Sequence, residues 1–163
     1  MKVFNRTKYV NCDKTGDSTL ETRSGIVDTL HEMEVVLVAD MRKMTIIRAE
    51  SGIMRAPYRI CREISARAGA LAGLTIDGEI GRNIRSLVGG PGGCYQLEDL
   101  CLEAVKAIRQ CDYAFEKGGH EELIRRFDRA LRGTCYAHSH SLEEKIKEAA
   151  SPNLVVDYTA FTR

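Results

Sequence analysis

The 163-residue chain predicts an α+β fold, an antiparallel β-meander in the N-terminal third followed by a helical layer packed on one face. Two observations predict it: apolar and polar residues alternate as far as residue 52, and from Pro57 onward apolar residues recur at helical spacing. Strands first and helices afterwards favour segregated layers. We expect one domain over residues 1–163, with the meander at 1–52, the helical part at 57–150 and an edge strand at 154–161.

The meander is expected to contain about four strands. Residues 3–12 alternate loosely, DKTGD supplies turn chemistry, and TLETRS follows before Gly25, which together indicate a hairpin. A strand is clearest from Ile26 to Asp40, and MTIIRAES is its predicted antiparallel partner after a turn at 41–43. The odd positions of the long strand form one mostly apolar face: Val27, Thr29, His31, Met33, Val35, Leu37 and Ala39.

The helical part begins at Pro57, because proline is favoured at a first helical position. Its first helix carries an apolar stripe of Cys61, Ile64, Ala68 and Leu71. A short helix is predicted over 79–88, and the strongest helical pattern runs over 97–115, after the loop GGPGG. Another helix is expected over 123–131, and Ser141 with Glu144 forms a capping-box pattern for a last short one.

Charge and hydropathy argue against some classes of binding partner. The 24 Lys and Arg nearly cancel the 23 Asp and Glu, so no strong overall field recruits nucleic acid or a membrane surface. The first residues lack the apolar stretch of a signal peptide, and nowhere is there an apolar run of about 18 residues. We therefore expect a cytoplasmic protein with no nucleic-acid or membrane partner. A homo-oligomer, a partner protein and an unknown small-molecule ligand stay open.

Six cysteines occur in a chain too long to need disulfides for its stability, so we expect mostly free thiols. No C-x-x-C pair is present, and any cysteine site must therefore be assembled by folding. The loop GGPGGC does not match a phosphate loop, because it lacks a Gly-Lys-Ser/Thr ending and fails the G-x-G-x-x-G spacing.

Cys94 is the best candidate among the thiols, since it stands where the glycine loop becomes a helix. The helix dipole there favours the thiolate, which is the form that binds metals and attacks electrophiles. The alternative is a small residue buried under a tight turn. We assign Cys101 and Cys111 to packing, since both lie on the apolar stripe of the long helix. Cys12 is assigned to a turn with no role, and Cys61 alone is ambiguous.

Histidines supply the other candidates. His31 interrupts an apolar strand face, so its ring nitrogens need partners, either as a structural histidine or as a metal ligand. Asp28 would face the opposite side of a regular strand, and sharing a site with it would require a bulge. In CYAHSHS, the two histidines are interpreted as surface residues, and Cys135 stays open.

The chain resembles a bacterial family known as domain of unknown function 2889, over roughly residues 25–135. The resemblance rests on these residues: Asp28, His31, Met33, Asp40, Pro57, Tyr58, Cys61, Gly73, Leu74, Gly89, Gly90, Gly93, Cys94, Leu97 and Cys135. The chain departs from the family at Gln96, where a histidine is common, which weakens a metal site at that position. The architecture is also similar to iron-sulfur cluster scaffold proteins, and this likeness implies a fold rather than a function.

These observations favour a metal-binding protein that holds zinc or a labile iron-sulfur cluster through Cys94 and Cys61, with His31 and Cys135 in support. A second hypothesis is a thiol-dependent enzyme, in which Cys94 is the nucleophile and His31 the general base. A third is a non-catalytic binding or oligomerisation domain whose cysteines all serve packing.

Overall fold

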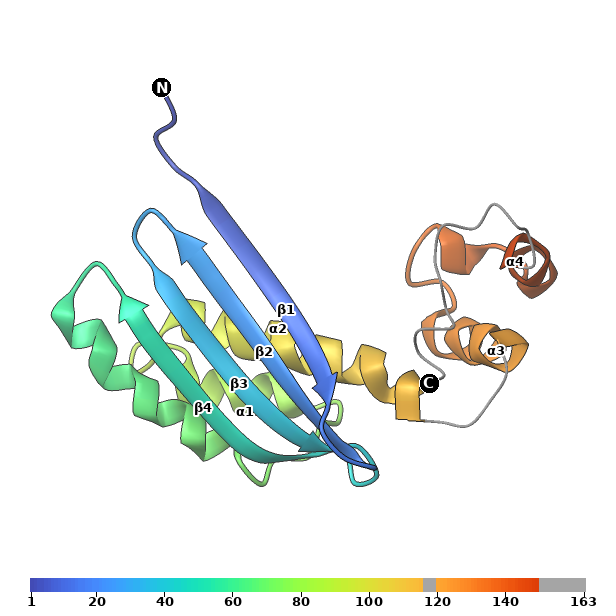
Figure 1. Ribbon diagram of the computed structural model, residues 1–163, viewed down its shortest axis with the longest axis horizontal. Helices are drawn as coiled ribbons and strands as arrows, with labels where there is room; N and C mark the ends of the chain where they lie inside the picture. The colour runs from blue at the N-terminus through green and yellow to red at the C-terminus, as the bar shows by residue number, and fades with distance from the viewer. Residues whose placement is uncertain (116–119, 150–163) are drawn as a thin grey trace. The chain divides into compact units, whose positions relative to one another are not determined.

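A four-stranded antiparallel sheet forms the N-terminal part of the chain, with the strands in the order β1-β2-β3-β4 (Figure 1). The strands are β1 (Arg6–Lys14), β2 (Thr19–Asp28), β3 (Glu32–Asp40) and β4 (Thr45–Arg55). Each strand pairs with the next through a short turn, as alternating sequences separated by turn residues predict. The computed structural model describes residues 1–115 and 120–149. Helices follow the strands, and the predicted α+β fold is confirmed.

The strand expected from Ile26 to Asp40 is wrong at its start. Strand β2 continues through Gly25 to Asp28, and the chain turns at 29–31 before β3 begins. Gly25 lies opposite Tyr9 in the β1–β2 register, and a Cβ added at Gly25 would lie only 2.2 Å from the Tyr9 ring. The tyrosine therefore covers the glycine, and the absent side chain does not interrupt the strand.

Helices cover one face of the sheet (Figure 1). They are η1 (Arg59–Leu71), α1 (Ile80–Val88) and α2 (Tyr95–Cys111), and the short η2 (Asp112–Phe115) follows α2 in the chain. Helix α2 packs across β1, β2 and β3, η1 packs beside β4, and α1 contacts both helices. The inward face of β3 is apolar and buried, as its odd positions predict, and so is the stripe of α2. The segment after Pro57 is a helix as expected, although it adopts the tighter 3-10 geometry.

The chain divides into two compact units, Met1–Asp112 and Tyr113–Arg163, where the sequence analysis expects one domain. The second unit contains α3 (His120–Leu131), η3 (Ala137–Ser139) and α4 (Leu142–Ala149). The capping box before α4 is confirmed, because the Glu144 N–H donates to Ser141 Oγ at 3.2 Å and the Ser141 N–H donates to Glu144 Oε2 at 3.0 Å. The edge strand expected at 154–161 lies outside the described residues. Within residues 1–115 and 120–149, no helix is both long and apolar enough to cross a bilayer.

Candidate functional site

The four residues predicted as metal ligands lie on separate segments. Cys61 belongs to η1, Cys94 directly precedes α2, and His31 lies in the turn between β2 and β3. Cys135 is an exposed residue of the second unit. All four are described, and within the described residues no group of three or more His, Cys, Asp or Glu side chains is arranged to hold a metal ion. Metal binding through this set stays a prediction.

The glycine loop before Cys94 is shaped by close packing. Cys94 has an extended backbone at the N-cap of α2, as predicted, and its N–H donates to Val88 O at 2.8 Å. A Cβ at Gly93 would lie 2.2 Å from Val88 O, and one at Gly89 would lie 2.2 Å from Glu98 Oε2. These two positions therefore require glycine for steric reasons, independently of any bound phosphate. No hydrogen bond connects the Cys94 thiol with His31 in the described part of the chain.

Asp28 and His31 form a compact polar unit at the end of β2. Asp28 Oδ1 accepts the backbone N–H groups of Leu30 at 2.7 Å and His31 at 2.6 Å, which closes the turn. The ring Nδ1 of His31 lies 3.1 Å from the same oxygen. Arg6 donates from Nε and Nη2 to Asp28 Oδ2, at 3.0 and 2.7 Å. The turn brings Asp28 and His31 together, and the bulge considered in the sequence analysis is not needed.

The Asp28 carboxylate is held in its charged form. Burial by itself would raise the pKa of Asp28, but the hydrogen bonds from Leu30, Arg6 and His31 together hold it well below its ordinary range. Since an ionised carboxylate can only accept, Nδ1 of His31 carries the proton and Nε2 is left for another partner. The side chain of His31 is 18% exposed. This arrangement orients an imidazole that can accept a proton or a metal ion.

A pair of thiols, Cys12 and Cys111, forms the second candidate. The even positions of β1 face α2, because side chains alternate along a strand. At one end of this contact Lys8 pairs with Asp99, and at the other the Cys12 side chain meets Cys111 in the last turn of α2. The two thiols lie close enough for each to shift the pKa of the other, and both residues are half-buried.

Cys12 is the member of the pair that ionises. Its register partner on β2 is the buried Thr22, whose Oγ1 lies 3.4 Å from Cys12 Sγ. The interaction with Cys111 and the hydrogen bond with Thr22 together lower the pKa of Cys12 to about 6, against the opposing effects of burial and of Asp13. The same interaction with Cys12, followed by burial, raises the pKa of Cys111. The pair therefore shares one proton near neutral pH, with the negative charge on Cys12.

The sequence analysis missed this pair. The assignment of Cys12 to a turn is wrong, since it lies within β1, and Cys111 contacts another thiol although packing was expected. The packing role of Cys101 is confirmed: it is fully buried, and burial raises its pKa to about 12. No sequence motif links residues 12 and 111, because their contact depends on how α2 crosses the sheet.

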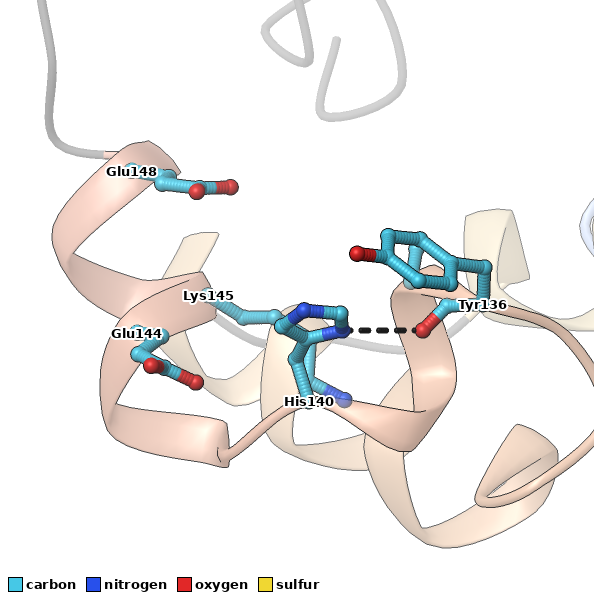
Figure 2. Close-up of a pocket in the computed structure, with 6 residues that line it drawn as sticks. Tyr136, His140, Glu144, Lys145 and Glu148 are labelled. Atoms are coloured by element: carbon cyan, nitrogen blue, oxygen red, sulfur yellow. Dashed lines mark hydrogen bonds between the residues drawn. The ribbon is translucent and has the colours of Figure 1, made fainter.

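The second unit has a small hollow (Figure 2). Tyr136 and His140 lie on one side of it and the acidic residues of α4 on the other. Its volume is about 240 Å³, which is below the usual range of ligand pockets of about 300–1,000 Å³. Several of its polar groups already serve the local structure: His140 Nδ1 lies 2.9 Å from Tyr136 O, Glu144 caps α4, and Lys145 Nζ donates to Asp128 at 2.5 Å. We therefore give it no ligand.

Comparison with known proteins gives one match. Residues 11–110 match a family described as "Protein of unknown function (DUF2889)". No curated protein and no solved structure matches the chain. The expected likeness to iron-sulfur scaffold proteins is therefore not supported by a solved structure, and a function has to be argued from the residues themselves.

Proposed function

The chain belongs to the DUF2889 family, and we propose that this member of it is a thiol–disulfide exchange protein whose Cys12 and Cys111 alternate between a dithiol and a disulfide. The single observation that carries the proposal is the contact of the two thiols across the β1–α2 interface, with the Thr22 hydroxyl beside Cys12. A cytoplasmic setting, where thiols are kept reduced between reactions, belongs to the same proposal.

The chemistry needs one nucleophilic thiolate and one resolving thiol. Cys12 suits the first role because its lowered pKa makes it largely thiolate at pH 7, and it is only half-buried. Cys111 suits the second because its raised pKa keeps it protonated until Cys12 has reacted. Cys101, which is buried and strongly protonated, takes no part.

The reaction would proceed in two displacements. The Cys12 thiolate attacks one sulfur of a substrate disulfide, whose S–S bond breaks and releases a thiolate that takes up a proton from solvent. Once Cys12 is in the mixed disulfide, Cys111 loses its proton and attacks Cys12 Sγ, which releases the second substrate thiolate. The two cysteines together lose two electrons and the one proton of Cys111. The substrate disulfide gains the two electrons and becomes two thiols, with one proton from solvent and one released by Cys111.

The first test is the pH dependence of alkylation. We expect iodoacetamide to modify Cys12 with a midpoint near pH 6, whereas an ordinary thiol reacts with a midpoint of about 8.5. Peptide mass spectrometry of partly alkylated protein gives the midpoint for each cysteine. Cys111→Ser should shift the Cys12 midpoint, because a hydroxyl replaces the thiol that donates to it.

The second test is disulfide formation under oxidised glutathione. Wild type should form an internal Cys12–Cys111 link, and Cys12→Ser and Cys111→Ser should not. Cys94→Ser and Cys61→Ser are matched controls, since both carry free, half-buried thiols elsewhere in the first unit, and should form the link normally. A Cys12 midpoint near 8.5 together with no link between residues 12 and 111 would refute the proposal.

Metal binding is a second candidate, favoured by one observation. A carboxylate that holds one ring nitrogen, as Asp28 holds His31, is the usual arrangement around a metal-binding histidine. Zinc or iron would then be held by Cys94, Cys61 and His31, all in the first unit. Metal analysis of anaerobically purified protein tests this: equal and negligible metal in wild type, Cys94→Ser and His31→Ala would exclude it.

A further inference from the structure

The N-terminal segment, the β2–β3 turn and the β4–η1 connection lie at one end of the sheet (Figure 1), and each of these regions carries exposed apolar residues. We define the sheet-end patch as these six residues: Val3, Phe4, Leu30, Met54, Tyr58 and Ile60. Each is at least half exposed, and Tyr58 and Ile60 reach 71% and 68%. Several exposed apolar residues at one end of a folded domain are typical of an interaction site.

Hydrogen bonds hold the three segments of the patch together. Asn5 and Thr29 join the N-terminal segment to the turn, with Thr29 N donating to Asn5 O at 3.2 Å and Asn5 N donating to Thr29 Oγ1 at 3.2 Å. Arg55 Nη1 joins β4 to the turn through Thr29 O at 3.0 Å. Arg62 Nη2 joins η1 to β4 through Met54 O at 3.0 Å. The segments that carry the six apolar residues are therefore joined to one another at this end of the sheet.

Positive charge surrounds the patch. Cations alternate with its apolar residues in the sequences KVFNR and MRAPYRICR, and the five are Lys2, Arg6, Arg55, Arg59 and Arg62. Three acidic residues face these cations. Asp28 is buried and binds Arg6, Glu32 pairs with Arg55 at 3.8 Å, and the third is Glu63. The end of the sheet is therefore net positive, although the whole chain is nearly neutral.

We propose that the sheet-end patch docks this protein on an anionic lipid surface, with the apolar side chains entering the headgroup region and the cations binding the lipid phosphates and carboxylates. Apolar and aromatic side chains interleaved with Lys and Arg are the composition of interfacial membrane-binding segments. A second copy of the chain is disfavoured as occupant, because two positive patches repel each other. The sequence analysis expects no membrane partner because the net charge of the whole chain is nearly zero. That total does not reveal the local excess of positive charge at this end of the sheet.

Co-sedimentation with vesicles tests the proposal on the full chain. We expect binding to vesicles of phosphatidylcholine mixed with phosphatidylserine, and weak binding to phosphatidylcholine alone. The double variant Leu30→Ser/Ile60→Ser should bind at least about tenfold more weakly, because it removes two inserted side chains. The control Ile47→Ser removes an equally exposed residue at the opposite end of β4, 53% exposed, and should bind like wild type.

A charge variant tests the electrostatic part. Lys2→Gln/Arg59→Gln should weaken binding to the anionic vesicles by about 25-fold, since each cation near such a surface contributes about fivefold. Equal sedimentation with both vesicle types, or wild-type binding by both double variants, would overturn the proposal. So would a concentration-dependent dimer that Leu30→Ser dissociates, because the occupant would then be a second copy. Alkylation of Cys12 is measured in a separate experiment. The thiol–disulfide proposal and the lipid-docking proposal can therefore be refuted independently of each other.

Discussion

Asp28 is the residue on which the β2–β3 turn depends. Its side chain has no exposed surface, yet it carries a charge compensated by Arg6, by two backbone N–H groups and by His31. A buried carboxylate of this kind stabilises the fold only while all its donors are in place, because an unpaired buried polar group is costly. The same residue fixes the imidazole of His31, so local stability and the orientation of that ring share one origin.

We predict that Asp28→Asn lowers the free energy of unfolding at pH 7 by about 2 kcal/mol, since an amide loses the charge-assisted bonds to Arg6. Because the folded-state pKa of Asp28 lies below its unfolded value of about 3.9, its contribution is present above that pH and is lost as the pH falls. Urea unfolding of both proteins between pH 7 and pH 2 should show their difference shrinking below about pH 4.

Asp40→Asn is the matched control for this prediction. Asp40 closes the next turn by accepting the N–H groups of Arg42 at 2.9 Å and Lys43 at 3.3 Å, in an exposed setting. Its substitution should cost under about 1 kcal/mol. A loss at Asp28 no larger than the loss at Asp40, or one that persists unchanged at pH 2, would contradict the account of the buried carboxylate.

The glycine loop before α2 is held in place by close packing of its backbone. Gly93 packs so closely that an added Cβ would meet backbone oxygens of Val88 and Gly89 at 2.2 and 2.3 Å. Backbone atoms cannot move aside as a flexible side chain can. The start of α2, and with it the position of Cys94, therefore depends on this contact.

Gly93→Ala should destabilise the first unit by about 2 kcal/mol or more, because the loop must shift to relieve the overlap. Gly92→Ala is its control: there the nearest atom is Arg67 Nη1 at 3.5 Å, an ordinary contact with a flexible side chain. Thermal unfolding followed by circular dichroism gives both values. Equal midpoints for the two variants would show that the loop can relax around a methyl group.

Elements were predictable from the sequence where a local pattern repeats. The stripe of α2 and the alternation of β3 identify both correctly, since periodicity reports which face is buried. The turn at 29–31 was missed because it contains neither glycine nor proline, although an Asp two residues before Leu30 is an Asx-turn signal. The Cys12–Cys111 pair had no such signal, because it depends on the crossing of a strand and a helix far apart in sequence.

The described buried apolar residues are unevenly distributed between the two units. Every buried apolar side chain among the described residues lies between Leu20 and Ile108, in the first unit. In the second unit, Asp128 is buried and binds Arg132 and Lys145 at 2.5 Å each. The apolar core that the structure describes therefore lies in Met1–Asp112.

A chain that ends at Asp112 should fold cooperatively, with a thermal midpoint within a few degrees of the full chain, because it retains the sheet, the covering helices and the core. Circular dichroism and differential scanning calorimetry of the two chains measure this. A fragment that is unfolded, or whose midpoint falls by about 10 °C or more, would show that residues 113–163 contribute to the core.

A disulfide bond between Cys12 and Cys111 would link the beginning of the first unit to its end. A covalent ring of about 100 residues would then enclose most of the sheet and all of α2, and restricting the unfolded chain to such a ring is worth about 4–5 kcal/mol in the loop-entropy treatment. The redox state of the cell would thus affect the thermal stability of the fold. Oxidising conditions, which form the disulfide, would raise that stability, and reducing conditions would lower it.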